Sequence, residues 1–244
     1  MCGISGIISK RNMQESRYND FIESSDLMNH RGPDYKAVFR ENEVLLIHYR
    51  LSIIDLDKRS NQPFFSKSEN LVTVYNGEIY NFEELANKHS IEQRTSSDTE
   101  VLTEMFEKGG KEIVNEWNGI FACVIYDRAK KKIHFMRDRL GVKPLYIYED
   151  DSVIAFSSEA KVILDWLPSF KLNRDALSQF TWFGNTTGLK THAQNLNKHA
   201  PGVITSIKFK NSFEVKEDYK FWSLKEVNEI SISETEAIQR TLRS

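Results

Sequence analysis

Cys2 is the residue of this sequence best placed for covalent chemistry, because only Met1 precedes it. Removal of an initiator methionine, which small second residues permit, would leave Cys2 with a thiol and a free α-amine. The thiol is a nucleophile, and an amine with a reference pKa of about 7.7–8.0 can act as its base near neutral pH. The alternative is a small buried cysteine that happens to lie near the start of the chain.

Two further positions could bind an anionic group. Arg50 follows a strand-like apolar run, and a guanidinium there is suited to bidentate binding of a carboxylate. The alternative for Arg50 is a solvated charge at a strand end. Asn76-Gly77 is a strong turn signal, and a plain hairpin turn is its simplest interpretation. The Asn76 amide and the Gly77 N–H could also form a two-donor oxyanion hole, because glycine lets a ligand approach the backbone closely.

Two carboxylates could accept a hydrogen bond from an ammonium group. Glu78 directly follows Gly77, and Asp98 lies in a run of Ser and Thr residues. Asp98 could equally be the N-cap of a helix, as could Ser97. His48 carries no local signature of Cys–His chemistry and is interpreted as structural, but amide hydrolysis by Cys2 and His48 stays as a competing hypothesis.

A charged cluster at 137–143 is interpreted as a turn between strands. It begins with Arg137-Asp138-Arg139 and ends with Lys143. Alternating charges at such a turn predict ion pairs with a structural role.

The composition is that of an ordinary globular protein of 244 residues, with 40% hydrophobic and 28% charged residues. A net charge of −2 gives no basic footprint for nucleic acid, and no apolar run approaches the length of a membrane span. Two cysteines make no disulfide framework, and without a Cys/His cluster we expect no metal site. These features fit a reducing cytoplasm.

Short strands and a few helices would position these residues. Closely spaced strand-like runs between polar turns indicate antiparallel pairing. Strands are expected at 3–9, 37–39, 44–48, 51–54, 71–75, 119–127, 132–137, 145–149, 153–157 and 203–209. Helices are expected at 15–29, 82–89, 99–108, 159–164 and 174–183, with Asn81 and Asn173 as caps.

The motifs, taken in order, resemble the glutaminase domain of class II glutamine amidotransferases. Within that group the chain is most similar to glutamine-hydrolysing asparagine synthetases. The resemblance covers about residues 2–222 and rests on Cys2-Gly3-Ile4, Arg31-Gly32-Pro33-Asp34, His48-Tyr49-Arg50-Leu51-Ser52-Ile53, Gln62-Pro63-Phe64, Asn76-Gly77-Glu78-Ile79-Tyr80-Asn81, Ser97-Asp98-Thr99-Glu100, Asn118-Gly119, Arg137-Asp138-Arg139-Leu140-Gly141 with Lys143-Pro144-Leu145-Tyr146, and Ser157-Ser158-Glu159.

The resemblance implies an α+β fold: a four-layer αββα N-terminal-nucleophile hydrolase sandwich with two antiparallel sheets. It implies that Cys2 attacks the glutamine side-chain amide to form a γ-glutamyl thioester, with the Cys2 α-amine as base. The other implied roles are oxyanion binding by Asn76 and Gly77, α-carboxylate binding by Arg50, α-ammonium binding by Glu78 and Asp98, and backbone lining by Leu51 and Ile53. No cofactor or metal is implied for this domain.

One feature of the resembled synthetases is missing. They continue into a second domain with a Ser-Gly-Gly-x-Asp-Ser loop that binds ATP, and this sequence has no such loop. We therefore expect residues 223–244 to be a linker and the start of a C-terminal synthetase domain that would use ATP and Mg. That domain and glutamine are the expected partners, and homodimerisation is left open. The non-enzymatic alternative is a glutamine-binding or scaffold domain.

Overall fold

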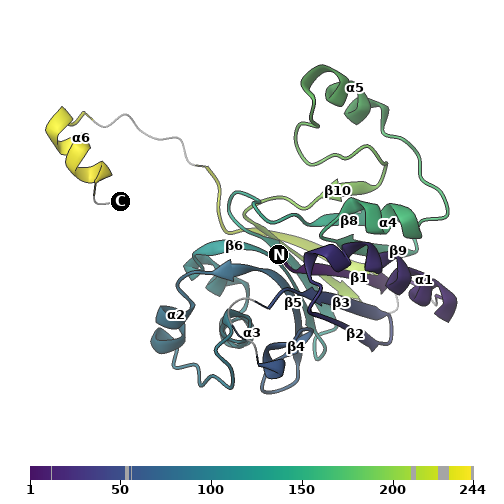
Figure 1. Cartoon of the computed structure of the whole chain (residues 1–244), viewed down its shortest axis with the longest axis horizontal. Helices are drawn as coiled ribbons and strands as arrows, with labels where there is room; N and C mark the ends of the chain where they lie inside the picture. The colour runs from purple at the N-terminus through teal and green to yellow at the C-terminus, as the bar shows by residue number, and fades with distance from the viewer. Residues whose placement is uncertain (12, 53–54, 56, 210–212, 225–230, 243–244) are drawn as a thin grey trace.

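The computed structural model describes residues 1–11, 13–52, 55, 57–209, 213–224 and 231–242. Its strands form two antiparallel sheets of six strands each (Figure 1). The first has the order β10-β8-β9-β1-β3-β2, with bounds Leu196–Lys198, Tyr146–Glu149, Val153–Ser157, Gly3–Ser9, Val44–Arg50 and Tyr35–Glu41. The second has the order β12-β11-β7-β6-β5-β4, with bounds Phe213–Lys220, Val203–Phe209, Lys132–Arg137, Gly119–Asp127, Leu71–Ile79 and Phe64–Phe65.

Helices cover the outer face of each sheet. The first sheet packs against α1 (Glu15–Ser25), the 3-10 helix η1 (Asp26–Arg31) and α4 (Ala160–Trp166). The second packs against α2 (Phe82–Lys88), α3 (Asp98–Gly109) and the 3-10 helix η3 (Gly110–Glu116). The remaining helices are η2 (Lys58–Ser60), α5 (Arg174–Phe183) and α6 (Glu234–Thr241).

The alternation of side chains along each strand separates three apolar cores. On β1, Ile4 and Ile8 belong to the core between the sheets, whereas Ile7 belongs to the core under α1 and α4. On β6, Val124 faces the inter-sheet core and Cys123 faces α3. A core on each side of both sheets makes four layers, so the expected αββα sandwich is confirmed.

The inter-sheet layer changes from apolar to polar along its length. On β3, Val44 and Leu46 belong to the inter-sheet core. The next two residues whose side chains lie on the same face of the strand are His48 and Arg50. On β5, Val74 is followed by Asn76 in the same way. Antiparallel β1 places Ile4 opposite His48, which brings Cys2 to the end of β3. The fold therefore gathers the polar candidates at one end of this layer.

Three local expectations were wrong. No strand forms at 51–52, and the rest of the strand expected at 51–54 lies outside the described residues. The helix expected at 15–29 ends at Ser25 and continues as η1. Asn81 precedes α2 but makes no capping bond; its side chain donates to Glu116 O (3.1 Å) and accepts from Asn118 N (3.0 Å). The backbone of 116–118 takes the amide that would otherwise cap the helix.

The charged cluster at 137–143 also differs from the expectation. Asp138 accepts backbone N–H groups, from Leu140 (3.1 Å) and Val142 (2.9 Å) among others, and Arg137 donates to backbone carbonyls such as that of Lys143 (2.6 Å). Within the described ranges, neither side chain forms an ion pair. The two charges hold a loop through its backbone, because a turn leaves many of its N–H and C=O groups unpaired.

The described residues contain no helix that is both long and apolar enough to cross a membrane.

Candidate active site

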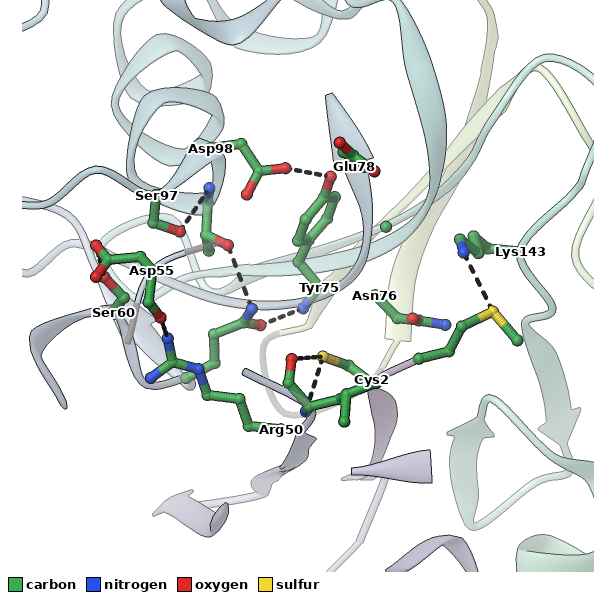
Figure 2. A pocket seen from close by; sticks show the side chains of 15 residues that line it. Cys2, Arg50, Asp55, Ser60, Tyr75, Asn76, Glu78, Ser97, Asp98 and Lys143 are labelled. Atoms are coloured by element: carbon green, nitrogen blue, oxygen red, sulfur yellow. Dashed lines mark hydrogen bonds between the residues drawn. The ribbon is translucent and has the colours of Figure 1, made fainter. Parts of the chain in front are cut away.

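A cavity of about 140 Å³ lies at the polar end of the inter-sheet layer (Figure 2). It is lined by Met1, Cys2, Arg50, Leu51, Asp55, Ser60, Gln62, Tyr75, Asn76, Gly77, Glu78, Ser97, Asp98, Thr99 and Lys143. Every site residue predicted from the sequence is among them except Ile53, which lies outside the described residues. Strands from both sheets and the first turn of α3 therefore converge on one space.

The Cys2 thiol is held by the chain just after β3. The Leu51 N–H donates to Sγ at 3.4 Å, and Sγ lies 3.8 Å from the Leu51 carbonyl oxygen. Arg31 Nε donates to the Cys2 carbonyl at 3.1 Å, which fixes the backbone beside the thiol. Burial raises the pKa of the thiol, with a smaller opposing effect from the Leu51 backbone. Cys2 is thus a neutral thiol at pH 7 and needs a base to become a nucleophile.

Arg50 keeps an uncompensated charge at the cavity wall. The residue is only 8% exposed, and its guanidinium donates to the Asp57 carbonyl (3.1 Å), the Asp55 carbonyl and the Asn61 amide oxygen. All three acceptors are neutral, and the described residues provide no ion-pair partner for it. A buried guanidinium held only by neutral oxygens is suited to a carboxylate ligand.

Asn76 presents an unsatisfied donor to the same space. The residue is 1% exposed, and within the described parts of the chain its Nδ2 has no hydrogen-bond partner. An unmade hydrogen bond on a buried amide costs about 1–3 kcal/mol. Such a group beside a nucleophile is what an oxyanion hole contains before its ligand arrives.

The direction of the Gly77 N–H follows from the register between β5 and β6. Gly77 lies opposite Phe121. Phe121 directs both backbone groups to Asp138: its N–H donates to Oδ2 (3.1 Å) and its carbonyl accepts the Asp138 N–H (2.8 Å). Because the N–H and C=O of a strand residue point to the same side, Gly77 and Phe121 form a non-hydrogen-bonded pair. The Gly77 N–H therefore points away from β6.

On the side of β5 that points away from β6, the backbone N–H groups next to that of Gly77 donate to side chains. The Tyr75 N–H donates to Gln62 Oε1 (2.6 Å) and the Ile79 N–H donates to Asp98 Oδ2 (3.0 Å). For the Gly77 N–H between them, the described residues show no acceptor. A Cβ at position 77 would lie 2.4 Å from the Ile120 carbonyl oxygen, so only glycine fits here. Asn76 and Gly77 thus offer two adjacent free donors.

The two carboxylates differ in environment. Asp98 opens α3, is 5% exposed, and accepts from the Tyr75 hydroxyl at 2.7 Å. Burial raises the pKa of Asp98, and the hydrogen bond from Tyr75 is the largest effect that opposes the rise. Glu78 is exposed at the cavity wall. The N-cap of α3 is Ser97, whose Oγ accepts the Thr99 N–H (3.2 Å), so the capping alternative for Asp98 was wrong.

Neither His48 nor His30, the histidine that precedes Arg31-Gly32-Pro33-Asp34, lines the cavity. His48 is fully buried, burial lowers its pKa to about 3, and its ring nitrogens have no hydrogen-bond partner in the part of the chain that the structure describes. His30 is at the surface, next to Glu159 (3.0 Å). Neither is placed to take a proton from Cys2.

The sequence prediction missed several residues of the cavity wall. Tyr75 directly precedes the Asn76-Gly77 motif, and Lys143 ends the cluster that was interpreted as structural. Both residues belong to motifs recognised in the sequence, but neither was assigned to the site. Gln62 bridges β5 and α3, donating to Thr99 Oγ1 at 3.3 Å. The described residues contain no group of three or more His, Cys, Asp or Glu side chains that could hold a metal ion.

Comparison with known proteins shows the family of the chain. Residues 1–222 match the model of a glutamine amidotransferase domain family. Over 195 residues the chain is 36% identical to asparagine synthetase [glutamine-hydrolyzing] 3 of Bacillus subtilis, covering 75% of this chain and 31% of that protein. Over 167 residues it is 36% identical to asparagine synthetase [glutamine-hydrolyzing] 2 of Oryza sativa subsp. japonica, covering 68% and 28%. The chain thus matches less than half the length of these relatives.

Solved structures support the fold. The glutamine phosphoribosylpyrophosphate amidotransferase of B. subtilis superposes with a TM-score of 0.59 at 17% identity, covering 91% of this chain and 49% of that one. A structure described as the allosteric regulatory enzyme of purine biosynthesis gives a TM-score of 0.61 at 18% identity, with the same coverage. The expected N-terminal-nucleophile amidotransferase fold is therefore confirmed.

Proposed function

Because this chain belongs to the glutamine amidotransferase domain family, we propose that it hydrolyses glutamine to glutamate and ammonia through a thioester on Cys2. The observation that carries the proposal is the pair of free donors at Asn76 and Gly77, in one cavity with the Cys2 thiol. A thiol and two unpaired N–H donors are the parts needed for attack on a carbonyl carbon.

Charge distribution orients the substrate. The α-carboxylate of glutamine binds Arg50, whose present acceptors are all neutral. The α-ammonium binds the carboxylates of Asp98 and Glu78, which lie on the same wall. The side-chain amide then extends toward Cys2. Binding at both α-groups selects a free amino acid, because a peptide lacks one or both charges.

The Cys2 α-amine, freed by removal of Met1, is the base that the neutral thiol requires. It takes the proton from Sγ, through a water, as Sγ bonds to the amide carbon of glutamine. Asn76 Nδ2 and the Gly77 N–H stabilise the oxyanion that forms. The carbon–nitrogen bond then breaks, and the ammonium form of the same amine returns the proton to the leaving nitrogen. Ammonia leaves and the γ-glutamyl thioester remains.

Water completes the reaction. The amine removes a proton from a water molecule that attacks the thioester carbonyl, and the same two donors hold the second oxyanion. The carbon–sulfur bond breaks, the thiol regains its proton, and glutamate leaves. These reaction steps use only groups of the chain, glutamine and water, so the domain itself needs no cofactor.

The use of the ammonia follows from the relatives. Proteins named as glutamine-hydrolysing asparagine synthetases are much longer than the matched region. We propose that a C-terminal synthetase domain, which would bind ATP and Mg, consumes the ammonia in the cytoplasm, and that residues 223–244 lead into it. Whether two copies of the chain associate is left to measurement of mass in solution.

The decisive experiment compares protein with and without Met1, verified by intact mass. Processed protein is expected to release glutamate from glutamine. Cys2→Ala is expected to lose all measurable release, with glutamine binding retained. Full activity with Met1 attached would contradict the terminal-amine mechanism, and binding without release by processed protein would favour the glutamine-binding alternative.

A further inference from the structure

Tyr75 lines the cavity and forms a hydrogen bond with the carboxylate of Asp98. Among the described residues, no other neutral side chain of the cavity wall does so. Tyr75 lies on β5, one residue before Asn76, and is 2% exposed. Its hydroxyl donates to Asp98 Oδ2 at 2.7 Å, as Figure 2 shows. The Ile79 N–H donates to the same oxygen at 3.0 Å. Both hydrogen bonds end on Oδ2, which leaves Oδ1 for a ligand.

We propose that Tyr75 is a positioning residue for the α-ammonium of glutamine: its hydroxyl holds Asp98 through Oδ2, so that Oδ1 is available to the ligand. The inference rests on the proposed function and assigns a role to a residue that touches neither the amide nor the thiol. A hydrogen bond to an ionised acceptor is stronger than one to a neutral group, so loss of the hydroxyl favours the protonated acid.

The surroundings of Asp98 explain why it needs such a donor. Burial raises its pKa and the nearby Glu78 adds to the rise, whereas the hydrogen bonds from Tyr75 and the Ile79 N–H, together with the adjacent Thr99 N–H, lower it. The charged or titratable groups around this region, besides Tyr75 itself, are Glu78 from β5, Cys123 from β6, Cys2 ahead of β1, Arg50 from β3, Asp55 and Lys143. Without the hydroxyl, Asp98 would be protonated over a wider pH range and would lose its attraction for an ammonium group.

The packing holds Tyr75 in place independently of a ligand. Its N–H donates to Gln62 Oε1 at 2.6 Å, and it lies opposite Cys123 in the β5–β6 register. The ring belongs to the core under α3. The hydroxyl therefore reaches α3 from a fixed strand, and replacement of Tyr75 by Phe removes the donor while the ring keeps its contacts.

The test measures glutaminase kinetics of processed protein from pH 5 to 8. Tyr75→Phe is expected to raise KM for glutamine about tenfold at pH 7 with kcat nearly unchanged, since a hydrogen bond to a charged group is lost. The acid limb of 1/KM should move to higher pH, because the hydroxyl that lowers the pKa of Asp98 is gone. The matched control is Tyr148→Phe, because Tyr148 also donates to an aspartate, Asp150 at 2.9 Å, but does not line the cavity.

A substrate analogue separates positioning from a general structural effect. The α-deamino analogue of glutamine carries the carboxylate and the amide but no ammonium. Its KM is expected to be equal in wild type and Tyr75→Phe. An equal rise in KM for both substrates, or an unmoved acid limb, would overturn the proposal.

A double variant covers the case in which Tyr75→Phe folds poorly. Tyr75→Phe combined with Asp98→Asn removes the buried hydroxyl together with the buried charge, so no carboxylate is left without its donor. In the Asp98→Asn background, loss of the hydroxyl should leave KM unchanged, and a further rise would refute the coupling. Inactive wild-type processed protein would instead refute the proposed function itself, so the two failures are distinguishable.

Discussion

The two ends of the inter-sheet layer are built by the same strands and differ in chemistry. At the apolar end, inward positions of β3 and β5 hold Val44, Leu46, Val72 and Val74. At the polar end, the continuing inward positions hold His48, Arg50, Asn76 and Glu78. Strand geometry places all of them alike, because alternation depends on the backbone and not on the side chain.

The difference lies in what satisfies the buried groups. The apolar side chains at the first end need no hydrogen-bond partners, and their burial against one another is itself favourable. At the second end Asn76 Nδ2 has no partner among the described residues, and Arg50 has only neutral ones. Such groups cost stability until a ligand binds them. One layer therefore provides stability at its apolar end and, under the proposed function, substrate binding at its polar end.

The largest expected effect is at the apolar end. Leu46→Ala removes a fully buried side chain from the inter-sheet core and should lower the free energy of unfolding by roughly 2–5 kcal/mol. Urea denaturation measures the change, and Val38→Ala, at a 42% exposed position of β2, is the control with an expected change under about 0.5 kcal/mol. At a temperature where Leu46→Ala is folded, kcat should match wild type; a parallel loss of kcat would break the comparison.

The second expected effect is the converse at the polar end. Asn76→Ala should lower kcat for glutamine by roughly 100- to 1,000-fold, because it removes one of two oxyanion donors. The free energy of unfolding should stay equal or rise, since an unpaired buried amide disappears. Steady-state kinetics and urea denaturation on the same preparation check both. Strong destabilisation by Asn76→Ala would mean that its amide is structural.

The third expected effect is a dependence of stability on pH, and it tests the boundary between the ends. Burial holds the pKa of His48 at about 3, against an ordinary value of about 6.5. Between these two values the unfolded chain binds a proton at His48 and the folded chain does not. The free energy of unfolding therefore falls as the pH drops from about 6.5 toward 3, by at most about 1.4 kcal/mol per pH unit. His48→Leu should remove this part of the slope, measured by urea denaturation across that range.

The same variant addresses the competing Cys–His hypothesis. His48 does not line the cavity, so His48→Leu should keep its glutaminase rate at pH 7. A loss as large as that of Cys2→Ala would restore His48 as a base.

Much of this arrangement could be predicted from the sequence. Strand-like runs and Gly or Asn turns predicted most of the strands, and the spacing of Arg50 and Asn76 from their apolar neighbours reflects the alternation that brings both into the cavity. The order of the motifs predicted the fold and the family. Local patterns are informative where the backbone alone decides the direction of a side chain.

Contacts between distant elements could not be predicted in this way. The Tyr75–Asp98 hydrogen bond exists because α3 packs on β5, which no local pattern encodes. The charged cluster that begins at Arg137 was expected to form ion pairs, but Arg137 and Asp138 bind unpaired backbone groups of the loop instead. Asn81 was predicted as a cap from its position, and the backbone of 116–118 takes its amide instead. In each case the deciding partner is remote in sequence or belongs to the backbone.

The place of Met1 has a practical consequence for anyone purifying this protein. Met1 lines the cavity beside Cys2, with its Sδ 3.2 Å from Lys143 Nζ. An affinity tag fused ahead of Cys2 would run through the same opening and turn the terminal amine into an amide. Under the proposed mechanism such a preparation would lack the catalytic base, so its inactivity would not show that the processed protein is inactive. The tag belongs at the other end of the chain.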